Sequence, residues 1–322
     1  MNQMKGKIVL ITGCTNSIGK QTAIELAGAG AIVLLHANDF SKGTAVLHSL
    51  RSSLPNAYFD LFIARLEVKA DMVQMARDIT MAYPKLDVLI NNESLYCEER
   101  TVSEEGIETS FAINHLAPFT LTHLLLPWLI NAGNARVINV SSHAHFIAQF
   151  DVHNLQGEAH YNGTKMFNCA KLCNLLFTYA LARQLEGQGI CVNAVHPGSV
   201  ELGYPGWMSD ELPGQTAEDG ADTIVFMASS AEVNNLSGMY FMSRLPVQSS
   251  YGSYSRKHQR QLWKLSERLA NIEHYFPAQL AGQRIAQKHN GLVRVMRQAA
   301  SKVSSLLAGA LMGGPFYYQE NH

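Results

Sequence analysis

The strongest constraint in this sequence is the regular alternation of short apolar runs with segments of helical pattern. The runs are rich in β-branched residues and are bounded by glycine, asparagine or proline. Strands that are apolar on both faces are typical of a parallel sheet covered by helices. We therefore predict a doubly wound α/β fold of the Rossmann type, with helices on both faces of a parallel sheet. The predicted strands are KIVLITG from residue 7, AIVLLHA from 31, YFDLFIARL from 58, LDVLINN from 86, ARVINVSS from 135 and GICVNAVHPG from 189.

The alternation stops after about residue 245. We assign residues 1–245 to the Rossmann-type domain and residues 246–322 to a helical C-terminal extension. The run VSSLLAGALMGGPFYY near the C-terminus is broken by Gly313, Gly314 and Pro315. It is also shorter than the roughly 20 apolar residues that a membrane span needs. We expect the extension to make a protein contact or to lie on a membrane surface, and a docked helix is the favoured interpretation.

Composition excludes several classes of protein. The formal net charge is −1, which does not indicate the basic surface that is typical of a nucleic-acid-binding protein. The five cysteines include no Cys-x-x-Cys pair, which favours reduced thiols. The chain enters its first predicted strand almost at once, and we expect a cytoplasmic protein. No histidine or cysteine spacing predicts a metal site.

A glycine-containing loop, TGCTNSIGK, joins the first predicted strand to the next helix. Its glycines allow the backbone to approach a pyrophosphate at the N-terminus of that helix. We take Gly13, Ser17, Ile18 and Gly19 as candidate cofactor-binding residues. Such a loop is a weak signal when it stands alone.

Other motifs make the signal specific. With the loop, they resemble the short-chain dehydrogenase/reductase family, in its retinol-dehydrogenase-like branch, over nearly all of residues 5–245. Farther along the chain, two motifs are similar to the end of the oxidoreductase domain of the WW-domain-containing oxidoreductase, namely GMYF at 238–241 and LWKLSERL at 262–269. The motifs that carry the family resemblance are LINNES at 89–94, FAINHLAPF at 111–119, RVINVSS at 136–142, HNLQGE at 153–158, KLCNLLF at 171–177 and VNAVHPG at 192–198.

The resemblance implies hydride transfer between NAD or NADP and an alcohol or a carbonyl compound. It gives Ser142 the role of hydrogen-bonding the substrate oxygen and Asn114 that of holding a water in a proton relay. The family lysine binds the nicotinamide ribose and lowers the pKa of a catalytic tyrosine. Alternatively, Ser142 simply ends a strand and Asn114 cross-links helices. The resemblance also implies cofactor contacts from Asn38, Asn91, Pro197 and Gly198.

Two overlapping frames compete for the tyrosine and lysine of the family. Tyr161 and Lys165 form Tyr-x-x-x-Lys, whereas Phe167 and Lys171 form Phe-x-x-x-Lys. In the branch that this chain resembles, the spacing from the lysine to His196 fits Lys171. Lys165 would add six residues, or about 9 Å of helix. We therefore place Phe167 at the position of the catalytic tyrosine, and phenylalanine has no group that can transfer a proton.

The cofactor motifs also depart from the family pattern. Ser17 stands where the middle glycine of the loop is usual. Ala37 and Asn38 offer neither an acid for a ribose hydroxyl nor an arginine for a 2′-phosphate, so NAD and NADP both remain open. Leu202 takes the place of a threonine that contacts the carboxamide.

Two further departures fall beside the expected cofactor channel. Arg65 occupies a position where an aspartate commonly binds adenine. Glu93 and Ser94 replace the alanine and glycine of the Asn-Asn-Ala-Gly motif. One expectation from these two departures is an ion pair between Arg65 and Glu93 across the groove.

Two functions follow from these observations. The favoured one is a family member with weakened or lost catalysis that acts by binding. The alternative is an active NAD(P)-dependent oxidoreductase for a lipophilic alcohol, aldehyde or ketone such as a retinoid or steroid, in which Tyr161 rescues the reaction by folding over the nicotinamide. The family resemblance also makes a homodimer plausible, through two helices at about 104–130 and 166–187.

Overall fold

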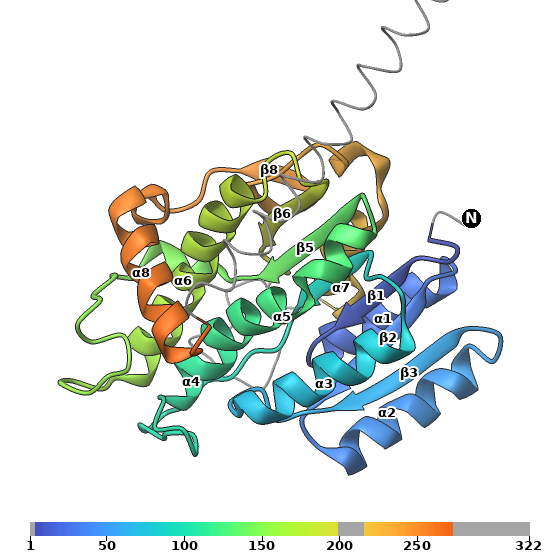
Figure 1. Cartoon of the computed structure of the whole chain (residues 1–322), viewed down its shortest axis with the longest axis horizontal. Helices are drawn as coiled ribbons and strands as arrows, with labels where there is room; N and C mark the ends of the chain where they lie inside the picture. Colours follow the sequence, from blue (N-terminus) through green and yellow to red (C-terminus); the bar gives the residue numbers. More distant parts are fainter. Residues whose placement is uncertain (1–3, 199–215, 273–322) are drawn as a thin grey trace, which may run out of the picture. The chain divides into compact units, whose positions relative to one another are not determined.

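The computed structural model describes residues 4–198 and 216–272. Its eight-stranded sheet has the order β3-β2-β1-β4-β5-β6-β7-β8 (Figure 1). Neighbouring strands are parallel except for the antiparallel pair β7 and β8. The predicted doubly wound fold is confirmed, and each predicted strand is present. The strands are β1 (Ile8–Ile11), β2 (Ile32–Ala37), β3 (Tyr58–Ile63), β4 (Val88–Asn91), β5 (Ala135–Val140), β6 (Ile190–Val195), β7 (Tyr240–Met242) and β8 (Leu245–Val247).

Helices cover both faces of this sheet. Helices α3 and α5 pack together on one face, and α1 and α7 pack together on the other (Figure 1). The α-helices are α1 (Ser17–Gly28), α2 (Phe40–Ser53), α3 (Lys69–Ala82), α4 (Thr109–Phe111), α5 (Ala117–Asn131), α6 (Gly163–Gln184), α7 (Ala217–Ser229) and α8 (Arg256–Leu269). Shorter elements are the π-helix η1 (Ala112–Leu116) and the 3₁₀ turns η2 (His143–Phe146), η4 (Ala231–Val233) and η5 (Tyr251–Tyr254).

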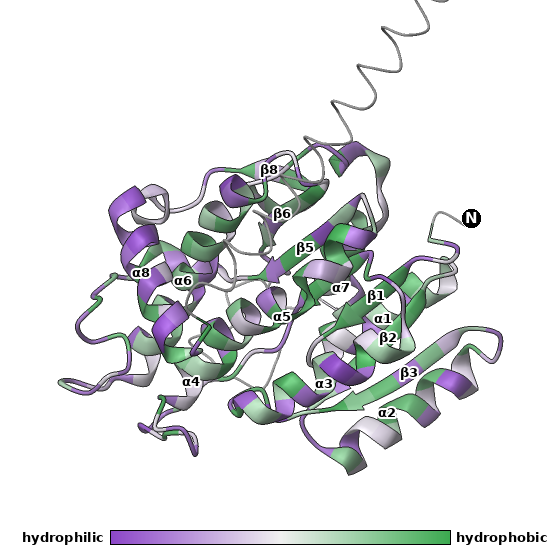
Figure 2. Ribbon diagram, viewed as in Figure 1, coloured by the Kyte–Doolittle hydropathy of each residue, from purple (hydrophilic) through white to green (hydrophobic). Residues whose placement is uncertain are grey.

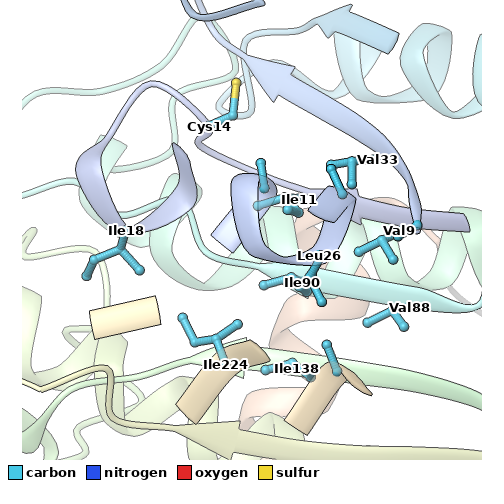
Figure 3. Close-up of a cluster of buried hydrophobic side chains, with 14 of the residues drawn as sticks. Val9, Ile11, Cys14, Ile18, Leu26, Val33, Val88, Ile90, Ile138 and Ile224 are labelled. Carbon is cyan, nitrogen blue, oxygen red and sulfur yellow. The ribbon is translucent and has the colours of Figure 1, made fainter. Parts of the chain in front are cut away.

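The core explains why the apolar runs become central strands. All four residues of β1 and all four of β4 are buried, because helices lie on both sides of the sheet. Figure 2 shows these central strands as hydrophobic along their length. In Figure 3, side chains of neighbouring strands, such as Val9, Val33 and Ile90, form one cluster with Leu26 of α1 and Ile224 of α7. Burying each such side chain contributes about 1.5–3 kcal/mol.

The residues that directly follow residue 245 do not form a separate unit. The expected boundary falls inside the β7–β8 pair, and residues up to Ile272 belong to the same compact unit as the sheet. Helix α8 packs on α6, and the Trp263 ring lies 5.1 Å from that of Phe119 in α5. The Nε2 atom of His115 and the Oγ atom of Ser266 are 2.8 Å apart.

The rest of the expected extension, residues 273–322, lies outside the described residues. Among the described helices, none combines the length and apolar character that a membrane span requires. The contact of the extension and the homodimer stay predictions. Helix α8 packs on the two helices through which that homodimer was expected, α5 and α6.

Candidate functional site

The glycine-containing loop turns tightly between β1 and α1. Gly13 has a φ of +71°, which favours glycine. A Cβ atom at Gly19 would lie only 2.4 Å from the carbonyl oxygen of Gly13, so this position also needs a glycine. The Asn16 side chain caps α1 by accepting a hydrogen bond from the Gly19 amide. Ser17 begins the helix at an exposed position, and Ile18 is buried below it.

Two buried side chains from neighbouring strands hold this loop. The Asn92 amide nitrogen donates to the carbonyl oxygen of Thr12 at 2.9 Å. The Gly13 amide donates to Nδ1 of His36 at 3.1 Å, so Nε2 of that ring donates to the carbonyl oxygen of Ala64 at 2.9 Å. Burial lowers the pKa of His36 to about 4, which keeps the ring neutral. The backbone N–H of Gly13 is therefore bonded within the chain.

Glu93 lies directly against Gly13. A Cβ atom on Gly13 would be 2.9 Å from the Cα, Cδ and Oε2 atoms of Glu93, so the backbone and the carboxyl group of Glu93 together border the space that the missing side chain leaves. The Ser94 amide donates to Oε1 of Glu93 at 3.1 Å. Burial raises the pKa of Glu93 above its usual range, and attraction by Lys171 partly opposes that shift. As it stands, this carboxyl group does not fit a cradle for an anionic diphosphate.

The far end of the expected cofactor groove is open and polar. Asn38 follows β2 and is exposed. Arg65 lies after β3, where its Nε atom pairs with Asp71 at 2.8 Å and its Nη1 atom with Glu104 at 2.6 Å. The expected Arg65–Glu93 ion pair was therefore wrong. Two carboxylates on the surface attract the guanidinium away from the buried groove.

Asn91 and the turn after β6 complete the set of expected cofactor residues. The Asn91 amide donates to Oδ1 of Asn139 at 2.8 Å, which links β4 to β5. Pro197 is buried after β6, and Gly198 has a φ of +89°. Leu202 lies outside the described residues.

Phe167 and Lys171 face the same buried region from one side of α6. Their side chains are 3% and 1% exposed. The Nζ atom of Lys171 lies 5.2 Å from the centre of the Phe167 ring and donates a long hydrogen bond of 3.5 Å to the carbonyl oxygen of Val140. Burial lowers the pKa of Lys171 to about 7, while Glu93 raises it. The lysine therefore lies over an aromatic ring that carries no hydroxyl group.

Asn114 and Ser142 lie on elements that pack against α6. Asn114 is fully buried within the π-helix η1, a local irregularity that is frequent at functional sites. Its Oδ1 atom accepts from the Ser94 hydroxyl and the Leu95 amide, both at 3.1 Å. Ser142 follows β5 and accepts from the Ala144 amide at 3.2 Å. Ser142 thus ends a strand, as its alternative role required, whereas Asn114 joins η1 to the segment after β4 and does not link two helices.

The hydroxyl of the competing tyrosine has its own hydrogen-bond partners. Tyr161 precedes α6, whose N-cap is Asn162, while Lys165 is exposed in the first turn. The Tyr161 hydroxyl lies 2.9 Å from the carbonyl oxygen of Cys97 and 3.3 Å from Oε1 of Glu108. Phe167 and Lys171 thus lie together, whereas the Tyr161 hydroxyl bonds to a separate set of polar groups.

Sequence reasoning left three site residues out. His36 is a single histidine in an apolar strand, and no local signal links it to the Gly13 amide. Asn92 follows β4, which pairs with β1, and its place in the Asn-Asn motif was a usable signal. Glu108 is fully buried and caps α4 by accepting from the Ser110 and Phe111 amides.

Two other features of the described residues bear on the site. Within residues 4–198 and 216–272, no group of His, Cys, Asp and Glu side chains is arranged to hold a metal ion. A cavity of about 1060 Å³ lies near the starts of β5 and β6, lined by Gly133, Gly189 and Ile190 among others. Ligands of doubly wound folds bind at the opposite, carboxyl ends of the strands.

Comparison with known proteins identifies the family. The family model described as short chain dehydrogenase matches residues 7–204. Retinol dehydrogenase 12 of Mus musculus is 34% identical over 281 residues, which cover 84% of this chain and 88% of that protein.

Solved structures show the same fold. A crystal structure of an uncharacterised protein from Mycobacterium paratuberculosis has a TM-score of 0.70 and 28% identity, and the match covers 83% of this chain and 94% of that one. A metagenomic short-chain oxidoreductase in complex with NADP has a TM-score of 0.59 and 21% identity, covering 74% and 97% of the two chains. With the loop, the sheet order and the α6 lysine in place, the chain belongs to the short-chain dehydrogenase/reductase family, in its retinol-dehydrogenase-like branch.

Proposed function

We propose that this chain is a short-chain dehydrogenase/reductase that has lost, or nearly lost, the proton transfer of its family and acts by binding. The observation that carries the proposal is the burial of Phe167 at the face of Lys171, 5.2 Å from the ammonium group. A benzene ring can neither donate nor accept the proton that accompanies hydride transfer. One well-placed acid or base contributes about 10²- to 10⁴-fold to a rate.

The neighbouring phenols support the same interpretation. Tyr96 packs edge-on to Phe167 with ring centres 6.2 Å apart, and its hydroxyl donates to Oε2 of Glu98 at 2.6 Å. The Tyr161 hydroxyl is bonded to Cys97 and Glu108. Both hydroxyls thus bond to groups other than Lys171.

Family membership and the NADP complex of the metagenomic relative support a nicotinamide dinucleotide as the cofactor class. When bound, this group would supply the hydride. Gly13, Gly19, Lys171 and the Pro197–Gly198 turn are the residues of this chain that would hold it. The choice between NAD and NADP is open because exposed Asn38 suits neither form specifically.

Restoring the tyrosine tests the proposal. Wild type and the Phe167→Tyr variant are assayed with millimolar NADPH or NADH and a panel of carbonyl compounds that includes retinal. We expect no turnover above background for wild type and a gain of at least about 10²-fold for the variant, because Asn114, Ser142 and Lys171 remain in place. The same substitution in a Glu93→Ala background covers the case in which the cofactor enters poorly.

Two control variants make the result specific. Phe167→Leu alters the same buried position without adding a hydroxyl, so it should stay inactive. Tyr161→Phe in the Phe167→Tyr background should leave the gained activity unchanged. No gain in either background, from folded proteins that bind cofactor, would mean that more than the tyrosine is missing.

The second candidate function is an active oxidoreductase for a lipophilic alcohol, aldehyde or ketone. It is favoured by the identity to retinol dehydrogenases. It is also favoured by Asn114, Ser142 and Lys171, to which the resemblance gives family roles. In that case wild type itself turns over and Tyr161→Phe abolishes the activity. The two functions therefore predict opposite results for turnover by the wild-type protein.

A further inference from the structure

We infer that Glu93 is an internal occupant of the dinucleotide cradle, and that its carboxyl group must move aside or lose its charge before a nicotinamide dinucleotide can bind. This inference rests on the cofactor class of the proposed function. It does not depend on whether the chain catalyses a reaction.

The first step is the shape of the loop. Gly13 adopts a φ of +71°, and its missing side chain leaves a space in front of its Cα atom. In a loop of this kind the glycines keep the turn tight and let a cofactor pass close to the backbone. Here the Cα, Cδ and Oε2 atoms of Glu93 each lie 2.9 Å from where a Cβ atom of Gly13 would be, so the carboxyl group lies beside the turn together with the backbone of Glu93. A ligand atom and this carboxyl group cannot occupy the space together.

The second step is what holds the carboxyl group there. Oε1 accepts the amide hydrogen of Ser94, and Glu93 and the buried ammonium of Lys171 attract each other. Lys171 is also the residue that would bind the nicotinamide ribose. Glu93 therefore provides, from within the chain, both an acceptor in the cradle and a partial counter-charge for the family lysine.

The third step is charge. The groups that interact electrostatically with Glu93 are the cation Lys171 of α6, the carboxylate of Glu67 after β3 and the thiol of Cys14 in the glycine-containing loop. The diphosphate of a dinucleotide would add negative charge beside a carboxylate, at a site where little water screens the repulsion. Loss of the Glu93 charge should relieve the repulsion, and loss of its volume should open the space.

A matched set of variants separates these two effects. Glu93→Gln removes the charge and keeps the volume, while Glu93→Ala removes both. Glu99→Ala is the control, because Glu99 is an exposed carboxylate on the same connection. NADH and NADPH are titrated by fluorescence against each full-length protein, without substrate, and melting temperatures are measured with and without cofactor.

We expect Glu93→Ala to bind NADH at least tenfold more tightly than wild type, Glu93→Gln to fall between them, and Glu99→Ala to match wild type. The inference is overturned if folded Glu93→Ala and Glu93→Gln bind no more tightly than wild type. If Glu93→Ala does not fold, Glu93→Gln decides the matter alone, since it keeps the shape. Turnover by wild type would contradict the proposed function and leave this comparison of affinities intact.

Discussion

The Nζ atom of Lys171 lies 5.2 Å from the centre of the Phe167 ring, in a region where both side chains are almost completely buried. The family resemblance implies that this lysine acts on the phenol of a catalytic tyrosine. Here it faces a ring without a hydroxyl. Burying an ammonium group without its functional partner lowers the free energy of unfolding.

Replacement of Lys171 by methionine should therefore stabilise the protein. The folded-state pKa of Lys171 is about 7, below the ordinary value of 10.5, so the unfolded chain binds more protons between these pH values. The free energy of unfolding of wild type thus rises as the pH rises from about 7 to about 10.5. Because Glu93 loses its partial counter-charge in Lys171→Met, the gain at pH 7 should be smaller than the cost of burying the ammonium group, about 1–2 kcal/mol, with a smaller gain at pH 10.

Urea unfolding at the two pH values measures this gain. Lys165→Met is the control, because Lys165 is exposed on the same helix. If Lys171→Met lowered the free energy of unfolding at pH 7, favourable contacts would hold the ammonium group.

The glycine-containing loop gives a second prediction. A Cβ atom at Gly19 would lie 2.4 Å from the carbonyl oxygen of Gly13 and 2.8 Å from Nδ2 of Asn92, so Gly19→Ala forces the loop apart. We expect a loss of about 1–3 kcal/mol in the free energy of unfolding. Gly28 ends the same helix with no such atom within 4 Å, and Gly28→Ala should change stability by less than about 0.5 kcal/mol. Equal losses from the two variants would show that the close approach of Gly13 and Asn92 to Gly19 does not limit stability.

Cofactor affinity should depend on pH. The pKa of Glu93 is raised by burial, so its protonated fraction grows as the pH falls towards the acidic range. Lys171, with a pKa of about 7, gains its charge over the interval from about pH 8 to about pH 6. Both changes favour an anionic ligand, so wild type should bind NADH more tightly at pH 6 than at pH 8.

The Glu93→Gln variant separates the two contributions. It keeps only the part of the pH dependence that comes from Lys171, so its affinity should change less than that of wild type. Isothermal calorimetry at both pH values checks this. A steeper dependence in Glu93→Gln than in wild type would be inconsistent with our assignment.

The attachment of α8 gives a fourth prediction. Trp263 packs against Phe119 of α5 at 5.1 Å and Phe177 of α6 at 6.0 Å between ring centres. Trp263→Ala should cost about 3 kcal/mol, since truncation of a large aromatic residue leaves a cavity. Lys264→Ala, at the next and exposed position, should have little effect. Comparison of thermal midpoints tests this, and an unchanged midpoint for Trp263→Ala would show that α8 contributes little to the stability of the domain.

The central strands could be predicted because each is apolar on both faces over at least four residues, as in β1 and β4. Strands β7 and β8 could not, since each spans three residues and forms only by pairing at the edge of the sheet. The boundary near residue 245 was misplaced for the same reason. Local pattern does not report on contacts as distant in sequence as those between α8 and α5.

The residues of the candidate site stay a prediction, and several of their interactions could not be predicted. The spacing to His196 favoured Phe167 and Lys171, and the structure brings these two side chains together. The partner of Arg65 depended on surface carboxylates at Asp71 and Glu104, which no motif connects to it. The position of the Glu93 carboxyl group against Gly13 follows from side-chain rotation, which sequence spacing does not fix.

The central claim is that the scaffold remains while the proton-transfer step is lost. The most direct test is the rate at which the purified wild-type protein oxidises NADPH or NADH in the presence of retinal, at cofactor concentrations that saturate binding. We predict a rate indistinguishable from that of a protein-free control. Turnover at the rate of an active retinol dehydrogenase measured alongside it would contradict the account and would place the proton donor at a group other than Phe167.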